Sequence, residues 1–309
     1  MQRRLLGLSL VIVIGFVGGA VSRPMRKAPQ PQTKPNSQDF LRQMLRHERS
    51  SLLDLEVAGD LSGLPLAAAG FVSREDLLRL PQVTYVVSDD SNFKGSTEVR
   101  GVSLDVLARA ISSDGDKSMV VAVCDDLYRA HYPQAYIQAH HPLLVLEING
   151  RPPADWPKSK DGSGASLRPY LISQPQFTPS FKILSHQDEP QIPWGVLRLE
   201  FRNEQTLLSD VAPRGATAEN PTVQAGYRIA QQNCWRCHGP ETEGPQKGKL
   251  TWGGIALFAA TSPVNFANYV RNPQKLSKLA EMPGNPNYDD ATIRALIAYF
   301  RVFFPQEKR

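Results

Sequence analysis

Two patterns of hydrophobic and polar positions divide this 309-residue chain. From about residue 52 to residue 203, apolar residues come in short runs separated by turns, as in a domain built around β-strands. Met119 to Cys124 is continuously apolar and predicts a buried strand. Leu143 to Ile148 predicts another strand, which ends at the strong turn signal Asn149-Gly150.

Two further elements are predicted in this region. Leu104 to Ile111, after a turn at Gly101, has the spacing of a short helix. Near the end of the region the residues alternate with a period of two, which predicts a half-exposed strand with Leu197, Leu199 and Phe201 on one face and Arg198, Glu200 and Arg202 on the other.

After residue 220 the pattern becomes helical. Asn220 and Pro221 form a good N-cap and first-turn pair for a first helix. Asp289 or Asp290 can cap a last helix. The two helices are expected to cross, and their apolar residues are Val223, Tyr227 and Ile229 in the first and Ile293, Leu296, Ile297 and Phe300 in the last.

The remaining segments precede or connect these regions. Residues 1–22 combine Arg3-Arg4 with an apolar run and a small-residue exit, which predicts a secretory signal, with an uncleaved membrane anchor as the alternative. Residues 23–51 are expected to form a proline-rich linker and a short helix starting at Ser37, and residues 204–220 a polar linker. We therefore predict a multidomain protein, with an α+β domain at 52–203 and an all-α domain at 221–305.

The strongest chemical signal is the run from Cys234 to His238, because Cys-x-x-Cys-His is the spacing that attaches a c-type haem. Cys234 and Cys237 would bond to the haem vinyl groups, and His238 would ligate the iron. A thioredoxin site or a zinc site would need a βαβ context or a second pair of ligands, and the sequence has neither. Met282 lies forty-four positions after His238 and is the predicted second axial ligand, with Lys247 or Lys249 as alternatives.

From about residue 216 to residue 305 the segment resembles a class I cytochrome c. The matching features, in the order of that family, are Gly226-Tyr227, the motif from Cys234 to His238, Met282-Pro283 and Ala298-Tyr299. The resemblance implies one covalent haem c with a partly exposed edge, through which electrons pass. It also implies attachment of the haem outside the bacterial cytoplasm, which agrees with the signal and predicts a periplasmic location, with membrane anchoring as the alternative.

The region from residue 52 to residue 203 resembles the molybdopterin-binding domain of the sulfite oxidase family, which has a mixed sheet. The matching stretches are short: LEVAG at 55–59, LRLPQVTY at 78–85, GVSL at 101–104, LVLEING at 144–150, LRPY at 167–170 and WGVLRLE at 194–200. In that family a thiolate upstream of the segment matching 101–104 binds molybdenum, but Ser88 to Arg100 contains no Cys. Molybdopterin is therefore not expected, although a pterin bound in an altered way stays an alternative.

Other candidate groups are few. If Cys234 and Cys237 hold haem, Cys124 is the remaining cysteine, and its place on an apolar strand predicts a buried thiol. His131, His140 and His141 flank a short helix predicted at Pro133 to Ala139; they could bind a metal or an anionic pterin, but surface loop histidines are the expectation.

Charge adds a weak indication of the partner. From residue 216 onward there are eleven Lys and Arg against seven Asp and Glu, which could steer the domain towards an acidic redox protein. No basic motif with interleaved aromatic residues suggests nucleic acid. Three functions compete: electron transfer, with the first domain docking a partner enzyme; a molybdopterin oxidoreductase that passes substrate electrons to its own haem; and a haem gas sensor, which a Met282 ligand would disfavour.

Overall fold

The structure is a computed structural model that describes residues 43–65, 68–88, 90–158, 167–176 and 191–304. All of these residues belong to one compact unit. The signal predicted at residues 1–22 and the helix start predicted at Ser37 lie outside the described residues. Within the described ranges, no helix has the length and apolar character needed to cross a membrane.

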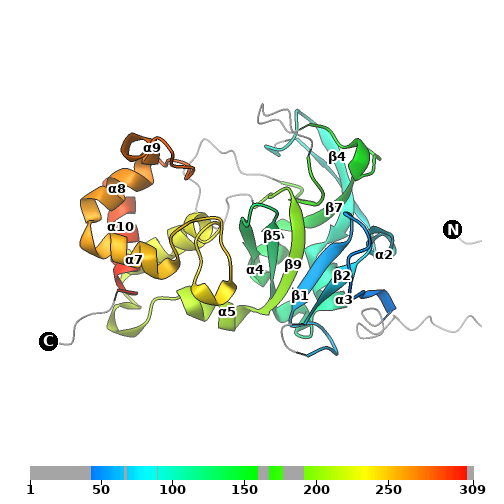
Figure 1. The fold of residues 1–309 in the computed structure, drawn as a ribbon, viewed down its shortest axis with the longest axis horizontal. Helices are drawn as coiled ribbons and strands as arrows, with labels where there is room; N and C mark the ends of the chain where they lie inside the picture. Colours follow the sequence, from blue (N-terminus) through cyan, green and yellow to red (C-terminus); the bar gives the residue numbers. More distant parts are fainter. Residues whose placement is uncertain (1–42, 66–67, 89, 159–166, 177–190, 305–309) are drawn as a thin grey trace, which may run out of the picture. The chain divides into compact units, whose positions relative to one another are not determined.

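The described residues between 55 and 203 form two β-sheets (Figure 1). The first sheet has the strand order β2-β1-β9-β5-β6; β1 and β9 are parallel and the other pairs are antiparallel, so the predicted mixed sheet is present. The second sheet is antiparallel and has the order β3-β4-β7-β8. The strands are β1 Leu55–Gly59, β2 Ala68–Val72, β3 Val83–Val87, β4 Thr97–Ser103, β5 Ser118–Cys124, β6 Arg129–Tyr132, β7 Leu143–Ile148, β8 Leu171–Ser173 and β9 Val196–Asn203.

Short helices connect these strands. The longest is α3, Leu104–Ile111, as predicted; the hydroxyl of Ser103 caps it by accepting a hydrogen bond from the backbone N–H of Val106. The turn predicted at Gly101 is wrong, because Gly101 lies within β4, where the register with β7 shifts. The turn predicted at Asn149-Gly150 is confirmed, since both residues have the positive φ angles that a tight turn requires. The other connecting helices are α2 Arg74–Leu78, η1 Gly115–Lys117, α4 Gln134–His140 and η2 Pro153–Asp155.

Strand β9 departs from the predicted alternation in two ways. A register shift opposite Val123 and Cys124 leaves Leu197 as a bulge, so Val196 faces the core and Leu197 is half-exposed. Glu200, which was expected in solvent, is buried because it lies under a cluster of arginine side chains.

Strand β5 contributes to two hydrophobic cores, which explains why its entire length is buried. Val120, Ala122 and Cys124 pack in the core between the sheets. The other face carries Met119, Val121 and Val123, which belong to a second core together with the C-terminal helices. The continuous apolar run thus reflects burial of β5 on both faces. The residues that cover the second face come from a distant part of the chain.

The C-terminal region is all-α, as predicted. Its first helix, α5, occupies part of the segment expected to be a linker, and its Leu207 and Val211 join the second core. The apolar face of α5 was hidden in the sequence by the surrounding polar residues. The helical segments of this region are α5 Glu204–Val211, η3 Gly215–Thr217, α6 Pro221–Ile229, η4 Ala230–Cys234, η5 Glu241–Glu243, α7 Trp252–Thr261, α8 Pro263–Arg271, α9 Pro273–Leu276 and α10 Asp290–Arg301.

Candidate haem-attachment site

Helix α6 leads directly into the cysteine motif. The side-chain oxygen of Asn220 accepts hydrogen bonds from the backbone N–H groups of Thr222, at 2.9 Å, and Val223, at 3.3 Å, as predicted for an N-cap. The predicted crossing with α10 is close: a Cβ added at Gly226 would lie 2.0 Å from the carbonyl oxygen of Ala295. Only glycine fits at this point of contact.

A π-helical turn, η4, then carries the chain from α6 into the motif. The backbone N–H groups of Cys237 and His238 both donate to the carbonyl oxygen of Cys234, at 3.1 and 2.9 Å. The motif is therefore a closed turn that keeps the two thiols and the imidazole on adjacent positions of one loop. Cys234 and Cys237 are not joined in a disulfide, and burial raises the pKa of the Cys234 thiol to about 12.

The imidazole of His238 is held by one backbone contact. Its Nδ1 lies 2.7 Å from the carbonyl oxygen of Leu250, so Nδ1 carries the proton and Nε2 is the available ligand atom. Burial lowers the pKa of His238, which favours the neutral form that binds metals. A Cβ at Gly248 would lie 2.2 Å from both Cε1 and Nδ1 of this ring, so the loop forms a cradle that only glycine permits.

The predicted second ligand, Met282, lies on the segment between α9 and α10. It is half-buried and packs against the C-terminal core. Its backbone carbonyl oxygen accepts a hydrogen bond from Nε2 of Gln274 at 2.9 Å. This hydrogen bond fixes the backbone of the segment that carries the thioether.

The lysines considered as alternative ligands lie in different surroundings. The ammonium group of Lys247 is paired with the carboxylate of Asp126, which follows β5. Burial alone would lower the pKa of Lys247, but the bond to Asp126 outweighs it and the pKa is raised. A lysine must lose its proton to ligate iron, so this pair opposes ligation by Lys247. Lys249 is exposed.

The motif is also attached to strand β6. The backbone N–H of Arg129 donates to the carbonyl oxygen of Arg236, inside the motif, at 2.8 Å. The ring of His131 stacks on that of Trp235, with 3.9 Å between centroids. Both contacts join residues about a hundred positions apart, and no sequence signal pointed to them.

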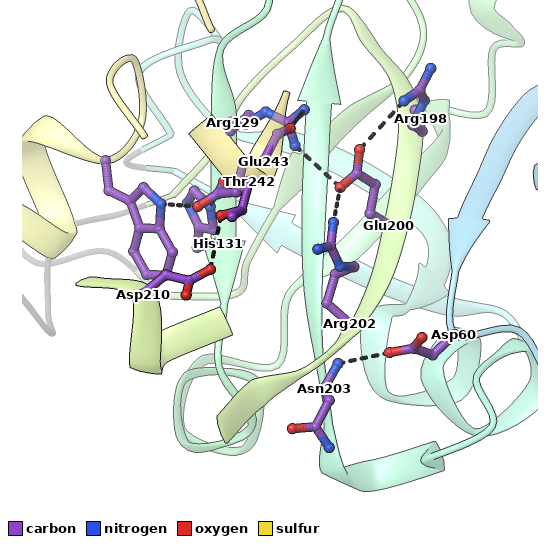
Figure 2. A network of polar contacts seen from close by, with 11 residues as sticks. Asp60, Arg129, His131, Arg198, Glu200, Arg202, Asn203, Asp210, Thr242 and Glu243 are labelled. Atoms are coloured by element: carbon purple, nitrogen blue, oxygen red, sulfur yellow. Dashed lines mark hydrogen bonds and ion pairs between the residues drawn. The ribbon is translucent and has the colours of Figure 1, made fainter. Parts of the chain in front are cut away.

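A buried carboxylate completes this attachment, as Figure 2 shows. Glu243 accepts a hydrogen bond from the indole N–H of Trp235 through one oxygen and lies 3.1 Å from Nε2 of His131 through the other. Burial alone would raise the pKa of Glu243, but the hydrogen bonds from His131 and Trp235 and the charge of Arg129 lower it overall. The carboxylate is therefore ionised at neutral pH.

The expectation of surface loop histidines is wrong for His131, which is 4% exposed on β6. His140 ends α4 and packs against Tyr136, with ring centroids 4.3 Å apart, and His141 is the left-handed C-cap of that helix. Among the described residues, no group of three or more His, Cys, Asp or Glu side chains is arranged to hold a metal ion.

Cys124 is a buried thiol, as predicted, with 4% of its surface exposed. Burial, reinforced by the charges of Asp126 and Asp125, raises its pKa well above the ordinary value. A thiol that resists ionisation is a poor metal ligand, because the thiolate is the form that binds.

The motif residues fit a covalent haem: two cysteines lie in one closed turn, and the histidine Nε2 is presented by a hydrogen bond on the opposite nitrogen. Comparison with known proteins supports this class. The family described as cytochrome c oxidase, cbb3-type, subunit III matches residues 221–300. The C-terminal region is therefore a cytochrome c domain, similar to that subunit, and such a domain implies haem c and electron transfer.

The similarities to solved structures are weaker. Among solved structures, the sulfane dehydrogenase SoxCD from Paracoccus pantotrophus matches with a TM-score of 0.32 and 14% sequence identity, over 51% of this chain and 40% of that chain. The chain thus spans less than half the length of that structure, and a likeness this low carries no argument about activity. The search of curated proteins found no match. The molybdopterin-type identity of the first domain stays a prediction.

Proposed function

We propose that this protein is a periplasmic mono-haem cytochrome c that transfers single electrons to or from a redox partner protein. The hydrogen bond between Nδ1 of His238 and the carbonyl of Leu250 carries the proposal, because it leaves Nε2 free in the form that a haem iron requires. Cys234 and Cys237 would hold the haem through thioethers. His238 and Met282 would be its axial ligands.

The haem, when bound, supplies the one-electron redox couple. The protein sets the reduction potential of the haem and controls how closely water and a redox partner approach it. A thioether ligand from Met282 would favour the reduced iron and raise the potential. The indole of Trp235, between the two cysteines, is 1% exposed and excludes water from that side of the loop. Its burial against β6 makes the attachment loop rigid, so little reorganisation is needed when the charge of the iron changes.

The domain at residues 52–203 is proposed to serve the partner rather than a second cofactor. The missing cysteine in Ser88 to Arg100 and the buried thiol of Cys124 both support a domain without molybdenum. The face of the first sheet that carries Arg129, His131 and Glu200 already contacts the cytochrome domain. Docking of a partner enzyme would therefore use other surfaces of this domain.

Metal analysis of protein matured with intact haem-attachment machinery tests this proposal. We expect one iron per chain, haem that stays with the polypeptide on a denaturing gel, and no stoichiometric molybdenum. The oxidised protein should show the weak near-infrared band of Met-to-ferric charge transfer. Stoichiometric molybdenum, with reduction of the haem by a small substrate such as sulfite, would instead establish the oxidoreductase, and a five-coordinate spectrum would favour the gas sensor.

The location is tested separately. Fractionation of cells that express the full chain should release the haem protein with the periplasmic contents and show a mass consistent with cleavage near residue 22. Retention in the membrane at full mass would establish the anchored form.

A further inference from the structure

We propose that Glu243 is a positioning residue of the haem site: it fixes the attachment loop to strand β6 and holds the reduction potential of the haem down. This inference rests on the proposed electron-transfer function. It assigns part of the haem environment to the first domain, because the partners of Glu243 come from both regions of the chain.

Glu243 connects three segments through separate atoms. One carboxylate oxygen binds the indole of Trp235, and the other lies 3.1 Å from Nε2 of His131 on β6. The backbone carbonyl oxygen of Glu243 accepts a hydrogen bond from the guanidinium of Arg129, also on β6, at 2.8 Å. The side chain of Glu243 is 1% exposed, so these contacts are shielded from water.

The proton between Glu243 and His131 can be assigned from the contacts. Two bare acceptors would repel each other at 3.1 Å, so Nε2 of His131 carries a proton and donates it to the carboxylate. Nδ1 of His131 is buried and has no hydrogen-bond partner among the described residues. The hydrogen bond at Nε2 is therefore the contact through which His131 reaches the carboxylate.

The nearest arginine, Arg129, binds the backbone of Glu243 and not its carboxylate. The second terminal nitrogen of Arg129 pairs with the carboxylate of Glu200 at 3.2 Å. Glu200 also forms ion pairs with Arg198 and Arg202 (Figure 2). The carboxylate of Glu243 accepts its hydrogen bonds from His131 and Trp235, and the charge of Arg129 acts on it from a short distance. A buried anion bonded to the residue between the two cysteines stabilises the ferric state over the ferrous state, because the ferric iron carries one more positive charge.

Redox titration of the matured full-length protein tests the inference, with Glu243→Gln as the main variant. The amide keeps the size of the side chain and removes its charge, so we expect the midpoint potential to rise. Glu241→Gln is the matched control: Glu241 lies on the same short helix, η5, carries the same charge and is exposed. We expect its potential to stay within the error of the parent, since water screens an exposed charge.

A second variant separates the charge from a general loosening of the loop. His131→Phe keeps a ring against Trp235 but removes the hydrogen bond that helps to keep Glu243 ionised. We expect the potential of this variant to rise, in the same direction as that of Glu243→Gln, because a buried carboxylate that loses a donor takes up a proton more readily. A fall of the potential in His131→Phe, or no shift of Glu243→Gln beyond the control, would overturn the inference.

Two further outcomes are distinguishable. If Glu243→Gln yields no haem protein, the titration of His131→Phe decides alone, and an unchanged or lowered potential overturns the inference. If the parent chain itself attaches no haem, the proposed function fails. If the parent attaches haem but neither variant changes the midpoint potential, only the proposed role of Glu243 fails.

Discussion

The two predicted axial ligands, His238 and Met282, differ in how the protein holds them. His238 is fixed through its ring, by the carbonyl of Leu250 on one side and the close backbone of Gly248 on the other. Met282 lies on a segment without regular structure and is held by a backbone hydrogen bond from Gln274 and by partial packing on the C-terminal core. We therefore expect the imidazole of His238 to be oriented before haem binds, and the thioether of Met282 to take its final position only with haem bound.

The largest effect is expected when the preformed side is removed. His238→Ala deletes the imidazole that Leu250 orients, so we expect loss of nearly all low-spin haem and a strong decrease in matured protein. Absorption spectra and haem staining of denaturing gels measure both. A His238→Ala protein with the parent spectrum would show that another residue is the proximal ligand.

Removal of the methionine side should be milder. Met282→Ala should keep covalent haem, because both cysteines and His238 remain, but it should lose the near-infrared charge-transfer band and lower the midpoint potential. Equal losses of haem from Met282→Ala and His238→Ala would contradict the proposed difference between the two sides.

A substitution that only disturbs the cradle should have a smaller effect. Gly248→Ala forces a methyl group against the ring of His238, which we expect to cost roughly 1–3 kcal/mol of unfolding free energy and to alter the spectrum of the bound haem. Gly253→Ala is the matched control, because its nearest contact would be an ordinary 3.8 Å. Chemical denaturation of both matured variants measures the difference; equal stability would show that the cradle relaxes freely.

The smallest effect on the haem is expected from Lys247→Gln. The ion pair with Asp126 is partly exposed, and such a pair contributes about 0–1 kcal/mol. The haem spectrum and the charge-transfer band should match those of the parent. If Lys247→Gln lost the charge-transfer band and Met282→Ala kept it, the assignment of Met282 as the second axial ligand would be wrong.

Much of the fold could be predicted, because local patterns report local structure. The run of apolar residues in β5, the cap of α3 and the turn after β7 were all found in this way. The bulge at Leu197 could not be predicted, since it depends on the register between β9 and β5. Nor could the burial of Glu200, whose cover is supplied by Arg129 on another strand.

The sequence by itself predicted the haem chemistry of this protein. Cys234, Cys237 and His238 lie within five consecutive residues, so their spacing along the chain does not depend on the fold. The choice of Met282 over other candidates also came from its place in the chain, and it stays a prediction.

Only the tertiary structure decided what surrounds that motif. The stack of His131 on Trp235 and the bonds of Glu243 bring together residues more than a hundred positions apart. A single buried His or Glu in a sequence does not show which partner compensates the cost of its burial. Which residue becomes the partner depends on how α5 and the cytochrome helices pack on β5. The hydrophobic periodicity of either region does not predict that packing.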